Sequence, residues 1–183
     1  HLDLLYSQNE ELSRYKPVFD RIRALQPYQL SDELEKFLHE LGIVGDAWEK
    51  LFDETISGLE FSIGDELLNL ESTLNLLTDH DRSKREMGAN ELSKVFSKNI
   101  KIFARIHNTQ AKEKEIIDQW RGMPSPQVGR HLSNHVEPEV VEALRNAVVA
   151  SYPNLSHRYY ELKREWMNLE YLEIWDRNAP VSY

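Results

Sequence analysis

A nearly unbroken helical pattern of about forty residues fills the middle of this chain, from Asp81 to Trp120. A pattern of this length exceeds an ordinary globular helix, so we expect two helices that meet at Ser97–Asn99. The pattern predicts a mainly helical protein. Its apolar side is formed by Met87, Leu92, Val95, Phe96, Phe103, Ile106, Ile117 and Trp120.

Shorter helical patterns occupy most of the remaining chain. Pro17 fits the first turn of one helix, where a missing N–H costs nothing, and Pro27 ends that helix. Ser31 is the expected N-cap of the next helix, and Gly42 is expected to stop it. Further helices are expected over Leu2–Leu12, Asp46–Ile56 and Asn69–Leu77, from Pro138 onward, and from Pro153 through Trp166.

One brief alternation of apolar and polar residues, from Leu59 to Leu67, predicts strands. Gly64 and Asp65 supply the expected turn of a hairpin. Because two strands alone are marginal in water, the hairpin should pack on helices. The predicted fold class is therefore all-α: a multi-helix lobe with one small β-hairpin near residues 59–68.

The charge balance argues against two classes of partner. Twenty-two Lys and Arg residues stand against thirty-one Asp and Glu residues, which gives a formal net charge of −9. A protein this acidic is not expected to bind nucleic acid or an anionic membrane as its main function. No apolar run approaches the ~18 residues of a membrane helix, and no signal-peptide pattern opens the chain.

The chain has no cysteine, which excludes disulfides, thiolate nucleophiles and cysteine-based metal sites. A helical zinc protease instead needs two histidines at positions i and i+4, with a glutamate directly after the first. His39-Glu40 begins this pattern, but Ile43 occupies the position of the second histidine. His39 is therefore interpreted as a surface residue of a helix.

His131 and His135 stand four residues apart and would share a face of a helix. However, Leu132 replaces the glutamate that the protease pattern requires. The favoured interpretation is a polar loop with two titratable side chains, and a metal site is the weaker alternative.

The segment from His157 to Lys163 combines aromatic and cationic residues. One interpretation is a helix face that meets a peptide ligand. The favoured interpretation is that Tyr159 and Tyr160 pack on neighbouring helices with their hydroxyls satisfied. A stripe of large aromatic residues is expected to belong to the core: Trp48, Phe52, Phe96, Phe103 and Trp120.

Several sequence blocks occur in a familiar order across nearly the whole chain, and together they resemble the N-terminal half of oligoendopeptidase F-type zinc metallopeptidases, relatives of thimet oligopeptidase. The order and spacing of the blocks carry the resemblance more than any single block does. The blocks are Leu30–Leu38, Ala47–Glu54, Leu59–Phe61, Asp81–Arg85, Trp120–Gly122, Val136–Leu144, His157–Lys163 and Asp176–Pro180.

The resemblance implies an elongated, mainly helical peptidase with a deep channel that admits unfolded oligopeptides and excludes folded proteins. It also implies a zinc ion held by a His-Glu-x-x-His helix and a downstream Glu, all in the C-terminal part. No catalytic, cofactor-binding or metal-binding residue of the family is therefore assigned to a position in this chain. Zinc is expected only in the full-length parent. The resemblance implies that the parent is a zinc metalloendopeptidase, whereas this chain alone is not expected to hydrolyse peptides.

The resemblance implies a domain organisation as well. Residues 1–168 are expected to form a non-catalytic helical N-terminal lobe, and residues 169–183 to begin the connection to a catalytic domain. Because the first residue is His1 and the tail carries no closing cap, we expect a piece of a longer protein. The expected partners are that catalytic domain and short unfolded peptides, in the cytoplasm, without nucleic acid or membrane. The alternative is a stand-alone helical interaction module without enzyme activity.

Overall fold

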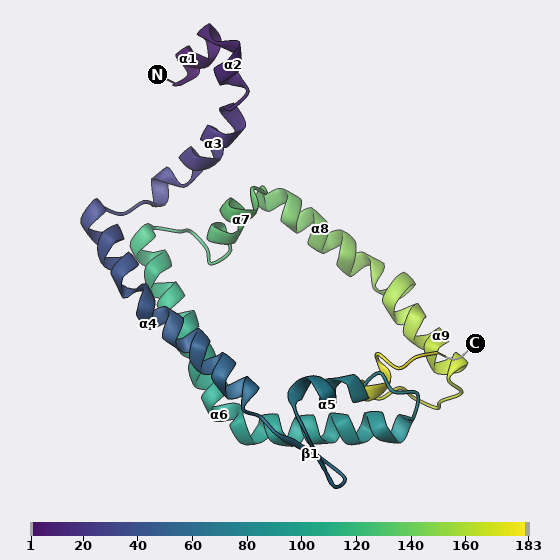
Figure 1. Ribbon diagram of the computed structural model, residues 1–183. Helices are drawn as coiled ribbons and strands as arrows, with labels where there is room; N and C mark the ends of the chain where they lie inside the picture. The colour runs from purple at the N-terminus through teal and green to yellow at the C-terminus, as the bar shows by residue number, and fades with distance from the viewer. Residues whose placement is uncertain (1, 182–183) are drawn as a thin grey trace. The chain divides into compact units, whose positions relative to one another are not determined.

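The computed structural model describes residues 2–181, and most of them are helical (Figure 1). The all-α class with one hairpin is confirmed. His1, Ser182 and Tyr183 lie outside the described residues. The structure therefore does not describe the first residue of the expected lobe or the last two residues of the expected connecting segment. The helices are α1 (Leu2–Gln8), α2 (Glu10–Ser13), α3 (Lys16–Ala24), α4 (Asp32–Ser57), α5 (Leu70–Leu76), α6 (Arg82–Arg121), α7 (Val128–Asn134), α8 (Pro138–Ser151) and α9 (Arg158–Trp166).

Shorter elements complete the chain: the strands β1 (Phe61–Ile63) and β2 (Glu66–Leu68), the 3₁₀ turns η1 (Gln26–Tyr28) and η3 (Ile174–Asp176), and the π turn η2 (Pro153–His157). The residues divide into two compact units. Unit 1 comprises residues 1–43 and 111–145, and unit 2 comprises residues 44–110 and 146–183. The boundary expected after residue 168 stays a prediction.

The hydrophobic core of unit 2 forms where the hairpin packs on α6. β1 and β2 pair antiparallel, with Phe61 opposite Leu68 and Gly64 at the turn with a positive φ of 61°. Phe61 is fully buried and its ring lies 6.1 Å from that of Phe96. This packing supplies the support that an isolated hairpin lacks. The buried centre consists of Leu59, Phe61, Leu92 and Val95.

Helix α6 runs without interruption from Arg82 to Arg121, so the predicted joint at Ser97–Asn99 is wrong. Ser97 is exposed, and the Asn99 side chain donates a hydrogen bond of 2.9 Å to the carbonyl oxygen of Val95, one turn earlier in the same helix. Polar residues here lie away from the core while Val95 stays buried. These polar residues interrupt the apolar pattern of the sequence, but the helix continues through them.

Helix α4 is also longer than predicted, because Gly42 does not stop it. The segments expected at 31–41 and 46–56 form one helix that passes through Gly42 and ends before Gly58. A glycine inside a helix costs only about 1 kcal/mol relative to alanine, which the flanking apolar residues can outweigh. The Ser31 cap is confirmed, since its side-chain oxygen accepts from the Leu34 amide at 3.4 Å.

The N-terminal helix is shorter than predicted. Asn9 interrupts Leu2–Leu12 and caps α2, because its side-chain oxygen accepts a hydrogen bond from the Leu12 amide at 3.1 Å. An asparagine side chain competes for backbone donors in this way and therefore favours a helix start over a helix interior. Pro17 lies in the first turn of α3, as predicted.

Helices α5 and α6 approach each other closely at Gly88. Asn69 caps α5 as predicted, accepting from the Ser72 amide at 2.8 Å. A Cβ atom at Gly88 would lie 3.0 Å from the Leu76 Cβ atom and 3.4 Å from the Thr73 carbonyl oxygen. The glycine is therefore part of the contact between these two helices.

Candidate functional site

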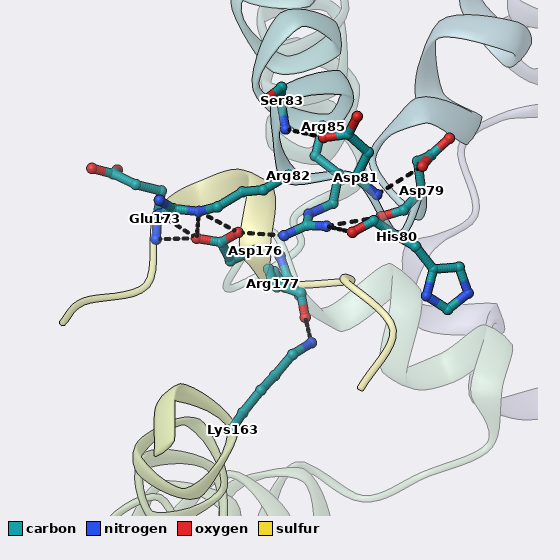
Figure 2. Close-up of polar contacts among 10 residues, drawn as sticks. All are labelled: Asp79, His80, Asp81, Arg82, Ser83, Arg85, Lys163, Glu173, Asp176 and Arg177. Carbon is teal, nitrogen blue, oxygen red and sulfur yellow. Dashed lines mark hydrogen bonds and ion pairs between the residues drawn. The ribbon is translucent and has the colours of Figure 1, made fainter. Parts of the chain in front are cut away.

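A buried carboxylate, Asp176, is the centre of a polar cluster that joins the tail of the chain to α6. It lies at the end of η3, in the tail that follows α9, and Figure 2 shows two arginine side chains from the start of α6 reaching it. Its side chain is 0% exposed. The described part of the predicted connecting segment is thus packed against α6, and its role as a connection stays a prediction.

Both arginines hold Asp176 through short hydrogen bonds. The Arg85 Nη2 atom donates to Asp176 Oδ1 at 2.8 Å, and the Arg82 Nη2 atom donates to Oδ2 at 2.9 Å. The Arg82 Nε atom lies 3.2 Å from each carboxylate oxygen. The Glu173 amide donates to Oδ2 at 3.0 Å, which closes a capping box around η3.

Arg85 also joins the cluster to the loop before α6. Its Nη1 atom donates to the carbonyl oxygens of Asp79 at 2.8 Å and His80 at 3.0 Å. Arg85 is 2% exposed, whereas the Arg82 side chain is 40% exposed. The fully buried ion pair is therefore the one between Arg85 and Asp176, and Arg82 supports it from the solvent side.

The cluster keeps Asp176 ionised. Burial would raise the pKa of its carboxyl group, but hydrogen bonds from Arg82, Arg85 and the Glu173 amide outweigh burial and hold the pKa at about 2. Because both oxygens already accept hydrogen bonds, the carboxylate has no vacant position from which to take a substrate proton. The geometry thus anchors the tail and does not suit general-base chemistry.

Lys163 of α9 ties a second helix to the same tail. Its Nζ atom donates to the carbonyl oxygen of Arg177 at 2.8 Å, and the residue is buried. Burial lowers the pKa of Lys163, and repulsion from Arg85 lowers it further. The less favoured interpretation of this segment placed Lys163 on a face that meets a peptide, and its burial contradicts that placement.

The two histidines considered as metal ligands line one open hollow, but only His131 lies within a helix. His131 lies in α7, but His135 is the C-cap of that helix with a left-handed φ of 52°. The segment is therefore a short helix rather than the predicted loop, and it ends before the second histidine. Within residues 2–181, no three His, Asp or Glu side chains gather as metal ligands would. His39 lies exposed on α4, as interpreted from the sequence.

An apolar groove runs between the first part of α4 and the last part of α6 in unit 1. It encloses about 280 Å³ and is lined only by apolar residues: Leu30, Leu34, Phe37, Leu38, Leu41, Ile116, Ile117 and Trp120. Trp120 is 66% exposed, so its predicted place in the core is wrong. Phe37 is also more than half exposed.

An ion pair connects the same two helices beside this groove. Arg121 donates to Glu35 through two parallel hydrogen bonds of 2.6 and 2.8 Å, and also to the Tyr28 carbonyl oxygen at 3.0 Å. The hydrogen bonds from Arg121 and from the Leu30 amide lower the pKa of Glu35 to about 2. We call these contacts of Arg121 with Glu35 and Tyr28 the polar clamp of unit 1. Among the described residues of unit 1, Tyr6 is the one that is buried.

The tyrosines of α9 are exposed, contrary to the favoured interpretation. Tyr152, Tyr159 and Tyr160 line an open hollow of about 590 Å³ at the junction of α8, η2 and α9. Within this junction the His157 amide donates a hydrogen bond of 3.0 Å to the carbonyl oxygen of Tyr152, five residues earlier, which is the pattern of the π turn η2. The sequence pattern indicated that these tyrosines share a helix face. Whether neighbouring helices cover their rings depends on the tertiary structure.

The sequence contained the residues of the polar cluster but no signal of their pairing. The blocks Asp81–Arg85 and Asp176–Pro180 both contribute to the resemblance. Nothing in either block predicts that Asp176 meets Arg85, because 91 positions separate them. Two arginines three residues apart on one helix face were the available hint.

Comparisons with known proteins confirm the resemblance. A family model described as Oligopeptidase F matches residues 1–61. An oligoendopeptidase F homolog of Lactococcus lactis is 23% identical over 181 residues, and the group B oligopeptidase PepB of Streptococcus agalactiae is 24% identical over 179 residues. Each alignment covers 94% of this chain and 30% of the relative.

A solved structure agrees with these sequence matches. The crystal structure of oligoendopeptidase-F from Enterococcus faecium superposes with a TM-score of 0.82 at 26% identity, covering 97% of this chain and 36% of that one. The chain is thus similar to the N-terminal region of oligoendopeptidase F-type peptidases. It spans about a third of the length of these relatives.

Proposed function

We propose that this chain is the substrate-channel lobe of a zinc metallo-oligopeptidase that hydrolyses short peptides. The similarity to oligoendopeptidases over 94% of the chain supports the protein class. The role in shaping a channel follows from the resemblance. In this proposal the bond-cleaving residues belong to the part of the protein that the relatives have beyond this region.

The apolar groove between α4 and α6 is the observation that carries the proposal. A free-standing protein rarely leaves a contiguous set of large apolar side chains in water, because burying them is favourable. In this groove Phe37 is 55% exposed and Trp120 is 66% exposed, so large apolar side chains remain open to solvent. A lobe would expose such a face where the remaining protein docks. A stand-alone interaction module would need a separate partner for it.

Zinc enters this proposal only through the resemblance. The described residues do not fit a zinc site, since no suitable group of His, Asp and Glu side chains occurs among them. We therefore assign no step of peptide hydrolysis to a residue of this chain. Its part is to bind and position peptides, and its net charge of −9 would disfavour acidic peptides at the channel rim.

The proposed location is the cytoplasm. Among the described residues, none of the helices combines the length and the apolar character needed to cross a bilayer. The proposed partners are the catalytic part of the same protein and short unfolded peptides.

The first experiment is to read the coding sequence beyond Tyr183 and to express the longest in-frame polypeptide. We expect a His-Glu-x-x-His segment followed by a further Glu, and hydrolysis of short peptides but not of folded proteins. A chelator should abolish this hydrolysis and zinc should restore it. A stop codon directly after Tyr183 would overturn the proposal and leave the interaction module.

A pair of variants tests whether the groove is a docking face. Phe37→Ser changes a residue that lines the groove, and Ile43→Ser changes an exposed residue of α4 that does not line it. In the longest polypeptide, Phe37→Ser should lower the free energy of unfolding by about 1–2 kcal/mol more than Ile43→Ser. Equal effects of the two variants would contradict docking at this groove.

A further inference from the structure

The hollow on α8, η2 and α9 differs in chemistry from the apolar groove. It combines aliphatic and aromatic side chains with hydroxyl groups, and it opens to solvent (Figure 1 gives the position of α8 and α9). All of its lining residues belong to unit 2. The main lining residues are Val148, Ser151, Tyr152, Leu155, Tyr159 and Tyr160.

The tyrosines present unused hydrogen-bonding groups at this hollow. Tyr159 and Tyr160 pack edge to face with ring centroids 5.3 Å apart, which fixes the two rings relative to each other. No hydrogen bond joins the hydroxyl of Tyr152, Tyr159 or Tyr160 to any described residue. The hollow therefore offers apolar surface together with free donors and acceptors, as peptide-binding surfaces do.

The charge of this segment is opposite to that of the chain as a whole. Residues 146–160 contain no Asp or Glu, although the chain has 31 such residues, and they contain Arg158. No hydrogen bond or ion pair connects the Arg158 guanidinium to any residue within 2–181. In contrast, Arg82, Arg85 and Arg121 are all bound to carboxylates. Arg158 is thus available for a carboxylate from outside.

We propose that this hollow binds the C-terminal residue of a short peptide with an apolar side chain. In this arrangement Arg158 pairs with the peptide's terminal carboxylate, for which a guanidinium is well suited. Arg158 is not one of the residues that line the hollow, but it stands three positions after Leu155, which does line it. This spacing places the guanidinium about one helical turn from the apolar surface. A C-terminal residue carries its carboxylate and its side chain on one carbon atom, which matches this spacing.

Two other occupants fit the hollow less well. Packing a protein lobe against it would bury free tyrosine hydroxyls and an unpaired guanidinium, which costs free energy unless each finds a partner. A second copy bound through the same face would bring two Arg158 side chains into one symmetric interface. The inference rests on the proposed function, because it names the substrate end that this lobe would hold.

The test measures binding without cleavage. The longest in-frame polypeptide, kept with a chelator, is titrated into an N-terminally labelled hexapeptide ending in Phe, and fluorescence anisotropy is recorded. The same peptide with a C-terminal amide, and one ending in Ser, are the ligand controls. We expect the free acid to bind about tenfold or more tightly than the amide, and more tightly than the Ser peptide.

Variants assign this preference to the hollow. Arg158→Gln should remove the preference for acid over amide, while Arg105→Gln, a change at an exposed arginine of α6, should leave it intact. Tyr159→Ala should weaken both peptides alike. Circular dichroism of each variant confirms that it is folded.

Three outcomes would overturn the inference. They are equal binding of acid and amide by the unmodified protein, an acid preference that survives Arg158→Gln, and dimerisation that Tyr159→Ala abolishes. The binding readout is independent of hydrolysis. A protein that binds the acid selectively but never cleaves peptides would remove the proposed peptidase function and leave this site standing.

Discussion

The Arg85 Nη2 atom lies 2.8 Å from the Asp176 Oδ1 atom, although 91 positions separate the two residues in the chain. Both side chains are almost completely buried. A buried ion pair costs desolvation when it forms, but removing one partner leaves the other charge uncompensated and is strongly destabilising. The attachment of the tail to α6 therefore depends on this contact.

We expect Asp176→Asn to lower the free energy of unfolding by about 3–5 kcal/mol, because it leaves the Arg85 charge buried without a counterion. Urea unfolding followed by circular dichroism measures this loss. Asp53→Asn, at an exposed residue of α4, is the control and should change stability by no more than about 0.5 kcal/mol. Similar small effects of both variants would show that the pair is dispensable.

The two arginines should contribute unequally. Arg85→Gln removes a buried guanidinium that also binds two loop carbonyl oxygens, whereas the Arg82 side chain is 40% exposed. Because solvent screens the exposed Arg82 charge, Arg82→Gln should lower the free energy of unfolding clearly less than Arg85→Gln does. Parallel urea titrations compare them, and an equal or reversed order would contradict the assignment of the buried pair.

The pH dependence of stability should reveal the Asp176 carboxylate. Its pKa is lowered from 3.8 to about 2, so its contribution is complete above about pH 4 and is lost as the pH falls through 2. This difference corresponds to about 2 kcal/mol. The gap in unfolding free energy between the unmodified protein and Asp176→Asn should therefore shrink by that amount between pH 6 and pH 2. A gap that does not change with pH would refute the lowered pKa.

Two glycine substitutions should have different effects on stability. Gly42→Ala in α4 meets no neighbouring atom, so better helix propensity should stabilise the protein by about 0.5–1 kcal/mol. Gly88→Ala in α6 places its Cβ atom 3.0 Å from Leu76, so crowding should cancel or reverse that gain. Thermal unfolding of both variants compares their stabilities. Equal stabilisation by the two substitutions would show that α5 can shift away from the added Cβ atom without loss of stability.

The Glu35 carboxyl should titrate abnormally because of Arg121. Its pKa is lowered to about 2, chiefly through hydrogen bonds from Arg121 and the Leu30 amide. Arg121→Gln should raise this pKa toward the ordinary glutamate range, and carbon-detected NMR across pH 1.5–6 measures it. Lys36→Gln, beside Glu35 in sequence but outside the clamp, should leave it nearly unchanged. An unaltered pKa in Arg121→Gln would refute the clamp.

The sequence predicted those elements that depend on local contacts. Asn69 and Ser31 act as caps because their side chains bond to amides three residues later. The hairpin follows from local alternation and from Gly64, whose positive φ suits a turn. The errors at Gly42 and at Ser97–Asn99 have one origin, since both were interpreted as breaks where the helix continues through a locally unfavourable or polar stretch.

Residue type and spacing by themselves determined the helical class, the hairpin, the caps and the resemblance to oligoendopeptidases. The first three depend on contacts within short segments, and the resemblance depends on the order of such segments along the chain. Only the tertiary structure decided that Asp176 meets Arg82 and Arg85, that Lys163 is buried, and that Trp120 is exposed. Burial and ion pairing between distant segments depend on which surfaces meet in space. A helical period gives the face of a residue but not what covers that face.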